Sequence, residues 1–144
     1  MTHESHSVAE TELIAAELAR TLRGGECVAL YGDLRAGKTQ FVRGLVRGLG
    51  GDAHAVCSPT FVLLNIYDSG GRLRVFHLDA YRVQGAGDFE AIGFAELLEQ
   101  GGVVVVEWAD RVESLLPTSR VNVRIQTMDE RSRRIEIKRD ESPV

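Results

Sequence analysis

The chain has 144 residues, of which 44% are hydrophobic, so its length and composition suit one domain built around a single core. Lys and Arg total 17 and Asp and Glu total 21, which gives a net charge of −4 at pH 7. This balance excludes the broad positive field with which many proteins attract nucleic acid or anionic membranes. We expect no DNA binding, and any connection to RNA to be local or to pass through a partner protein.

The cysteines and the first residues indicate a cytoplasmic protein. Cys27 and Cys57 lie in apolar surroundings without the spacing of metal ligands, which favours reduced thiols. The segment MTHESHSVAETE at 1–12 lacks the positive flank and apolar run of a signal peptide, and no stretch approaches the length of a membrane span. We therefore expect a cytoplasmic location and no contact with a membrane.

The first half of the chain predicts a helix, a strand and a second helix. Residues 11–23 carry apolar side chains at helical spacing and end at Gly24-Gly25. Residues 27–31, CVALY, form a short apolar run typical of a strand. A glycine-rich loop follows, and then a second helical stripe starts near Lys38. The loop is thus expected between a strand and a helix.

The second half predicts strands around a third helix. Residues 60–67 and 72–79 are strand-like runs joined by the turn-forming DSGG, so we expect them to pair. Residues 87–102 predict a helix with Asp88 as its cap. The uninterrupted apolar run at 103–107, VVVVE, is typical of a central strand covered on both faces. The alternating runs VNVRIQT and RRIEIKR predict a terminal antiparallel hairpin.

The loop at 32–39, GDLRAGKT, has the pattern of a phosphate-binding loop. Gly32, Gly37, Lys38 and Thr39 match G-x-x-x-x-G-K-[ST]. Glycines let the backbone amides turn toward phosphate oxygens, the lysine neutralises the β and γ phosphates, and the threonine hydroxyl is suited to Mg²⁺. The residues between them, Leu34, Arg35 and Ala36, complete the expected nucleotide-binding set of the loop. A merely flexible glycine turn is the structural alternative.

Two acidic residues at strand ends are candidate catalytic partners of Lys38. Asp79 ends VFHLD and Glu107 ends VVVVE, and the carboxyl ends of parallel strands face the ligand crevice in sheets of this type. Phosphate loops work with such an acid, which holds Mg²⁺ or orients water. Periodicity does not assign the two roles, and either acid can instead be a solvated strand-end carboxylate. The order of elements predicts an α/β fold: a three-layer P-loop NTPase-like domain with a mostly parallel central sheet and a C-terminal antiparallel hairpin. We expect one domain over 1–144, with flexible ends at 1–6 and 140–144.

Four motifs together resemble the small bacterial TsaE (YjeE) family. They are GDLRAGKT at 32–39, SPTF at 58–61, HLDAYR at 77–82 and VEWAD at 106–110, in the family's order and over about residues 7–137. The family is the ATPase component of the machinery that makes threonylcarbamoyladenosine in tRNA. The resemblance implies ATP and Mg²⁺ as cofactors, ADP as product, and weak hydrolysis that partners stimulate. It implies a regulatory ATPase on the TsaB–TsaD pair, which modifies adenosine 37 of tRNAs reading ANN codons, with tRNA met through that complex.

The resemblance also implies roles for individual positions. Glu107 and Thr39 are the expected Mg²⁺ ligands, and Asp79 resembles a second essential acid. Thr11 resembles a position near the adenine, although it can equally be a helix cap. Asp110 and Arg133 resemble positions at the edge of the nucleotide, and the SPTF segment resembles a switch-like loop or is an ordinary turn.

One departure from the family lies in the site itself. The family usually has glycine where this chain has Arg35, and a left-handed backbone there would cost an arginine about 1 kcal/mol or more. Arg35 is either a solvent-facing residue or an added positive charge near the γ-phosphate or a partner. The alternatives to a partner-stimulated ATPase are a small-molecule kinase of the same fold and a nucleotide-gated binding module without hydrolysis.

Overall fold

The computed structural model of the chain describes residues 1–32, 37–56, 64–67, 71–80 and 86–139. Seven strands form one sheet with the order β1-β7-β6-β2-β5-β4-β3. They are β1 (Thr2–Ser5), β2 (Cys27–Tyr31), β3 (Leu64–Tyr67), β4 (Val75–Asp79), β5 (Val103–Glu107), β6 (Val121–Thr127) and β7 (Arg133–Arg139). The four central strands, β6, β2, β5 and β4, are mutually parallel, and antiparallel pairs flank them on both sides.

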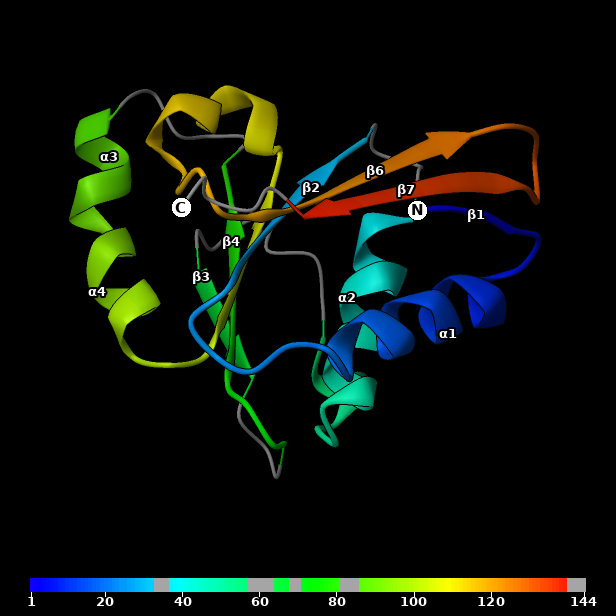
Figure 1. The fold of residues 1–144 in the computed structure, drawn as a ribbon, viewed down its shortest axis with the longest axis horizontal. Helices are drawn as coiled ribbons and strands as arrows, with labels where there is room; N and C mark the ends of the chain where they lie inside the picture. Colours follow the sequence, from blue (N-terminus) through cyan, green and yellow to red (C-terminus); the bar gives the residue numbers. More distant parts are fainter. Residues whose placement is uncertain (33–36, 57–63, 68–70, 81–85, 140–144) are drawn as a thin grey trace.

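Helices cover both faces of this sheet, which gives three layers (Figure 1). Two longer helices, α1 (Val8–Ala19) and α2 (Lys38–Gly48), lie on one face. Two shorter helices, α3 (Ala86–Ala91) and α4 (Phe94–Glu99), lie on the other side of the molecule (Figure 1). Short 3₁₀ turns complete the described elements: η1 (Ala53–Ala55), η2 (Ala109–Arg111) and η3 (Glu113–Leu115). The predicted α/β class, with a parallel centre and a terminal hairpin, is confirmed.

The central strands are apolar throughout because both of their faces are covered. Successive side chains of β5 point to opposite faces, so Val105 packs with α1 and α2 while Val106 packs with α4 and η2. All five residues of β2, β4 and β5 are buried. The chemistry of these strands is therefore confined to the few polar residues at their carboxyl ends.

A close approach of α1 and α2 fixes the helix that follows the phosphate loop. A Cβ atom on Gly44 would lie 2.3 Å from the carbonyl oxygen of Glu12 and 2.7 Å from the Cβ of Ala15. A Cβ atom on Gly48 would lie 2.7 Å from the Cα and the carbonyl oxygen of Ala16. An ion pair between Arg47 and Glu12, at 3.2 Å, joins the two helices at their rim. Glycine at these positions thus sets the distance between the helices, and with it the place where α2 begins.

The N-terminal segment differs from the prediction. Instead of a flexible stretch at 1–6, the structure has β1, which pairs antiparallel with β7, and the terminal amino group donates to the carbonyl of Ile137. Helix α1 then begins at Val8 and not at residue 11, because Ser7 caps it by accepting from the amide of Glu10 at 3.0 Å. The Glu10 carboxylate accepts from the amide of His6 in return, at 2.8 Å, so the two hydrogen bonds together fix the start of the helix.

The helix expected at 87–102 is two short helices. Gly93, with φ of 81°, occupies a left-handed conformation between α3 and α4 and breaks the run. Asp88 lies inside the first turn of α3, so it is not the cap of one long helix. The predicted strands at 27–31, 103–107, 121–127 and 133–139 are confirmed, as is the pairing of β3 with β4. The predicted strand residues 60–63 and the turn at 68–70 lie outside the described residues.

Candidate nucleotide-binding site

The ends of the phosphate-binding loop lie between β2 and α2, as predicted. Gly32 follows the last residue of β2, and Gly37 caps α2 with a left-handed φ of 99° that favours glycine. Among the described residues no side chain caps this helix end, and a helix start has backbone N–H groups that lack partners within the helix. Leu34, Arg35 and Ala36 lie outside the described residues. The described ends of the loop fit an anion at the start of α2.

Lys38 is held at the mouth of the loop. Its ammonium group donates to the carbonyl of Gly32 at 2.8 Å, and its nitrogen lies 3.8 Å from the centroid of the Trp108 ring. Only 5% of Lys38 is exposed, so its charge is directed into the site and not into bulk solvent. Thr39, the second residue of α2, is half-buried beside it. The structure thus brings a buried cation and a hydroxyl together at the helix start.

The two predicted acids lie side by side at the sheet edge next to the loop. Asp79 ends β4 and Glu107 ends β5, and the parallel register places these two residues opposite each other. They share the face of the sheet that α1 and α2 cover, because each follows the alternation of Val75 or Val103 on that face. Asp79 is 8% exposed and Glu107 is 5% exposed. Both carboxylates are therefore buried, which contradicts the alternative that either is a solvated carboxylate at a strand end.

His77 contacts Glu107, and this contact was not predicted. His77 is fully buried, and its Nε2 lies 2.5 Å from Oε2 of Glu107 on the neighbouring strand. Its Nδ1 lies 3.0 Å from the hydroxyl oxygen of Tyr67 on β3. Tyr67 carried no functional signal in the sequence, since its role depends on how three strands align.

Trp108 and Asp110 follow Glu107 directly. Trp108 has φ of 57°, which makes it the one non-glycine residue with positive φ in the described part of the chain. Its side chain is half-buried and packs against the core beneath α4 as well as against Lys38, so it contacts both the core and the candidate site. Asp110 lies in η2 and is exposed. The sharp turn at Trp108 therefore carries the chain from a buried acid to an exposed one within three residues.

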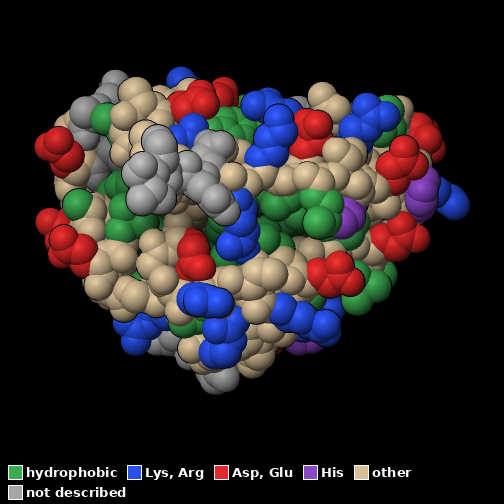
Figure 2. All heavy atoms as spheres, viewed as in Figure 1, with side chains coloured by type: hydrophobic (Ala, Val, Ile, Leu, Met, Phe, Trp, Pro, Cys, Tyr) green, Lys and Arg blue, Asp and Glu red, His purple; other side chains and the backbone are tan. Residues whose placement is uncertain are grey.

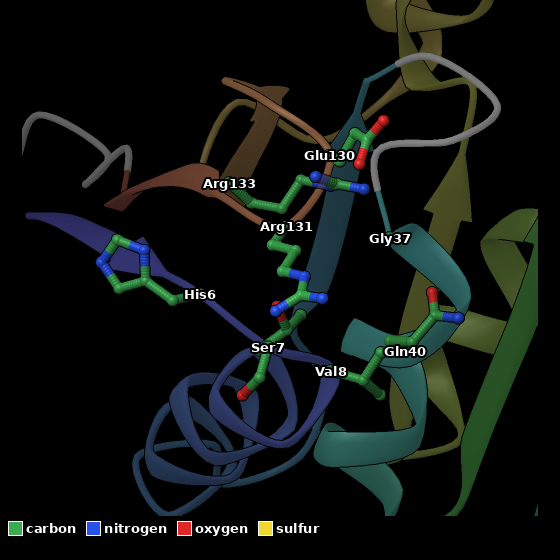
Figure 3. A pocket seen from close by; sticks show the side chains of 9 residues that line it. His6, Ser7, Val8, Gly37, Gln40, Glu130, Arg131 and Arg133 are labelled. Carbon is green, nitrogen blue, oxygen red and sulfur yellow. The ribbon is translucent and has the colours of Figure 1, made fainter.

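A pocket of about 440 Å³ opens beside Gly37, at the end of the phosphate-binding loop. It is lined by His6, Ser7, Val8, Thr11, Gly37, Gln40, Glu130, Arg131 and Arg133. These residues come from the start of α1, the start of α2 and the turn between β6 and β7 (Figure 3). The volume suits a small ligand, and Glu130, Arg131 and Arg133 supply the acidic and basic groups of the lining. The sequence indicated only Thr11, Gly37 and Arg133 of this set.

Thr11 is a wall residue of the pocket and not a helix cap. It lies within α1, is 3% exposed, and its hydroxyl is 2.7 Å from the hydroxyl of Ser5. Ser5 in turn donates to the carbonyl of Ser7 at 2.8 Å. The S-x-x-E spacing from Ser7 to Glu10 is the signal that would have placed the start of α1 correctly.

Arg133 is anchored at the start of β7. Its guanidinium group donates to the carbonyls of Asp129 and Ser132, at 2.9 and 3.0 Å. Two backbone amides, those of Arg131 and Ser132, donate to the Asp129 carboxylate and lower its pKa. The turn that presents Arg131 and Arg133 is thus fixed by hydrogen bonds of its own.

Charged side chains elsewhere are mostly engaged with the protein. Arg43 donates to the carbonyl of Val56, Arg47 pairs with Glu12, and Arg72 donates to the carbonyl of Ala19. On the face shown in Figure 2, basic and acidic side chains are interspersed. Among the helices of the described residues, none is long and apolar enough to cross a membrane.

A parallel-centred α/β sheet with a glycine-rich loop, a buried lysine and two strand-end acids defines a P-loop NTPase-like domain. Comparison with known proteins agrees. The family model for "Threonylcarbamoyl adenosine biosynthesis protein TsaE" matches residues 5–135. The tRNA threonylcarbamoyladenosine biosynthesis protein TsaE of Treponema pallidum is 40% identical over 133 residues, 92% of this chain and 96% of the relative.

Two proteins of Bacillus subtilis extend the comparison. The protein described as tRNA threonylcarbamoyladenosine biosynthesis protein TsaE is 37% identical over 126 residues, 88% of this chain and 77% of the relative. A crystal structure of YdiB superimposes with a TM-score of 0.79 at 30% sequence identity, over 98% of this chain and 86% of YdiB. The chain belongs to the TsaE family of threonylcarbamoyladenosine biosynthesis proteins.

Proposed function

We propose that this protein is an ATP-binding and ATP-hydrolysing component of threonylcarbamoyladenosine synthesis, acting as a regulatory ATPase on its TsaB and TsaD counterparts. The observation that supports the proposal is the burial of Lys38, Asp79 and Glu107. The Lys38 ammonium group donates to Gly32 at the end of the phosphate-binding loop, and the two buried carboxylates lie opposite each other at the ends of β4 and β5. Burying three ionisable groups is costly unless they serve a charged ligand or pair with one another.

The residues of the site fit a Mg²⁺–nucleotide complex. Mg²⁺ prefers oxygen ligands and is usually held in nucleotide sites by one or two protein groups together with phosphates and water. In this proposal Thr39 and Glu107 hold the metal, and Asp79 is the second acid, near the attacking water. When bound, the metal neutralises charge that develops on the phosphate oxygens. Lys38 binds the β and γ phosphates, and the amides at the start of α2 bind the loop-facing oxygens.

The pocket at the starts of α1 and α2 is proposed to receive the nucleoside part of ATP. Thr11 and Arg133 line it, and Gly37 connects it to the phosphate loop. Asp110 is proposed to contact the nucleotide's edge from η2. Because the pocket has an exposed rim formed by the β6–β7 turn, the bound nucleotide would be accessible to partner proteins. We further propose that the chain works as one cytoplasmic domain and meets tRNA through the complex.

The decisive experiment measures ATP turnover by the purified chain, alone and with the TsaB and TsaD counterparts and tRNA. We expect weak hydrolysis alone and clear stimulation by the pair. Phosphate transfer to a small acceptor in place of water would instead identify a kinase. Tight ATP binding with no phosphate release under any condition would identify a nucleotide-gated binding module, and absence of stimulation would contradict the regulatory role.

A further inference from the structure

Tyr67, His77 and Glu107 form a hydrogen-bonded chain across three neighbouring strands, β3, β4 and β5. The Tyr67 hydroxyl lies 3.0 Å from His77 Nδ1, and His77 Nε2 lies 2.5 Å from Glu107 Oε2. The side chains of His77 and Glu107 are 0% and 7% exposed, and Tyr67 is buried as well. The rings of Tyr67 and His77 are also packed, with centroids 5.8 Å apart. The chain is thus shielded from solvent over its whole length.

The order of donors along this chain follows from its chemistry. A carboxylate only accepts hydrogen bonds, so the Nε2 of His77 carries the proton and donates to Glu107. The Nδ1 of a neutral imidazole is then an acceptor, and the Tyr67 hydroxyl is the group that donates to it. The Glu107 carboxylate thus selects the tautomer of His77, and the Tyr67 hydroxyl stabilises that tautomer by donating to Nδ1. Every hydrogen bond in the chain points toward Glu107.

We infer that His77 is a positioning residue, which holds the Glu107 carboxylate toward the phosphate loop, and that Tyr67 stabilises the tautomer of His77 that donates to this carboxylate. The inference rests on the proposed role of Glu107 in holding Mg²⁺. A carboxylate fixed through one oxygen cannot rotate freely, so its orientation is set before the metal and nucleotide arrive. Residues that orient a metal-binding group in this way typically contribute about 10–100-fold in metal affinity.

A structural histidine predicts a different outcome from a positioning histidine. If His77 only fills space, any well-packed replacement restores activity, and the Tyr67 hydroxyl is dispensable. If His77 positions Glu107, the donor at Nε2 matters and packing alone does not replace it. Glutamine can place an amide donor near the position of Nε2, whereas leucine has a similar bulk and no donor.

The first test compares His77→Leu, His77→Gln and Tyr67→Phe, with His54→Gln as the matched control because His54 is exposed. Turnover is measured against Mg²⁺ concentration at saturating ATP, and ATP binding is measured without Mg²⁺. We expect His77→Leu to raise the half-saturating Mg²⁺ concentration about 10–100-fold while metal-free ATP affinity stays within about twofold. We expect a smaller rise for Tyr67→Phe, which keeps the ring, and substantial rescue in His77→Gln.

The second test needs no turnover. In ¹⁵N spectra of the ligand-free protein we expect His77 to be the Nε2–H tautomer with a slowly exchanging proton. Glu107→Gln, which keeps an acceptor but removes the charge, should shift its Nε2 resonance and leave His54 unmoved. The inference would be overturned by an Nδ1–H tautomer of His77, or by an Nε2 resonance that Glu107→Gln does not shift. Equal activity of folded His77→Leu and His77→Gln would also overturn it. A wild-type chain without turnover would instead overturn the proposed function, while these spectra would still decide the role of His77.

Discussion

The ammonium nitrogen of Lys38 lies 3.8 Å from the centroid of the Trp108 ring, so the cation of the phosphate-binding loop rests on the indole next to Glu107. A cation over an aromatic face is stabilised by about 0.5–2 kcal/mol, depending on how dry the contact is. Trp108 is the only tryptophan of the chain, and its fluorescence therefore reports on the position of Lys38. The contact links the lysine of the phosphate-binding loop to the residue that follows Glu107.

Lys38→Ala should lose phosphate affinity. A hydrogen bond from a charged group contributes about 1.5–3 kcal/mol, so we expect ATP affinity to fall about 10–100-fold. Titrations that follow Trp108 fluorescence measure this loss, and ATP should change the wild-type signal as Lys38 turns toward phosphate. Lys138→Ala is the matched control, because Lys138 is the other lysine of the chain and is exposed on β7. Unchanged ATP affinity in Lys38→Ala would contradict the assigned role.

Glu107→Ala should lose turnover more than binding. The proposed role of Glu107 is exerted on the metal, so we expect kcat to fall at least about 100-fold while ATP affinity changes only a fewfold. Single-turnover assays together with equilibrium ATP binding separate the two effects. Glu99→Ala, at the exposed end of α4, provides the acidic control. Equal loss of binding and turnover in both Lys38→Ala and Glu107→Ala would contradict the division of roles.

Gly44→Ala should destabilise the fold. The added methyl group would lie 2.3 Å from a backbone oxygen of α1, so the two helices must separate. Overpacking of this kind costs about 1–3 kcal/mol, which urea denaturation can measure. Gly87→Ala is a matched control in α3, since a Cβ there meets no atom within 4 Å. Because alanine favours helix over glycine, the control should be neutral or stabilised by up to about 1 kcal/mol. Equal destabilisation of both variants would refute the close-approach argument.

Cys27 should resist thiol reagents and make the fold sensitive to alkali. Burial raises the pKa of its thiol from 9.0 to about 12, although Arg120 lowers it slightly. Above pH 9 the thiol ionises in the unfolded chain but stays protonated in the folded protein, so rising pH favours unfolding. The contribution of Cys27 to the free energy of unfolding is therefore complete below pH 9. It falls by about 1.4 kcal/mol for each pH unit as pH rises toward 12. In a Cys57→Ser background, we expect Cys27 to react at pH 8 only after unfolding. The stability advantage over Cys27→Ala should shrink between pH 9 and 12, as denaturation at several pH values would show.

Local sequence pattern predicts those parts of the site that are contiguous in the chain. A phosphate-binding loop is contiguous and strand-end acids follow apolar runs, so the sequence predicts Lys38, Asp79 and Glu107 as site residues, and the structure shows all three buried. The pairing of His77 with Glu107 was not predicted, because it depends on the register between β4 and β5, two strands separated by α3 and α4 in the chain. Tyr67 needs the register of a third strand as well.

The N-terminal strand was missed for a different physical reason. Its residues, Thr-His-Glu-Ser, have neither the apolar alternation nor the β-branched content of a typical strand. They are ordered by backbone pairing with β7, which is a tertiary interaction that no local propensity encodes. The break at Gly93 was missed because the apolar spacing of 87–102 continues across it. The first miss is thus a tertiary effect, and the second is a local left-handed glycine that apolar spacing does not reveal.

The pairing of β1 with β7 has a consequence for how this protein behaves in concentrated solution. Strands at the border of a sheet carry backbone groups that can pair with another molecule and seed aggregation. In the described sheet β1 is an outermost strand and is only four residues long. Without β1, the seven-residue β7 would form that border instead. The short N-terminal strand thus covers the longer edge, and a chain lacking its first five residues should aggregate more readily than the full chain.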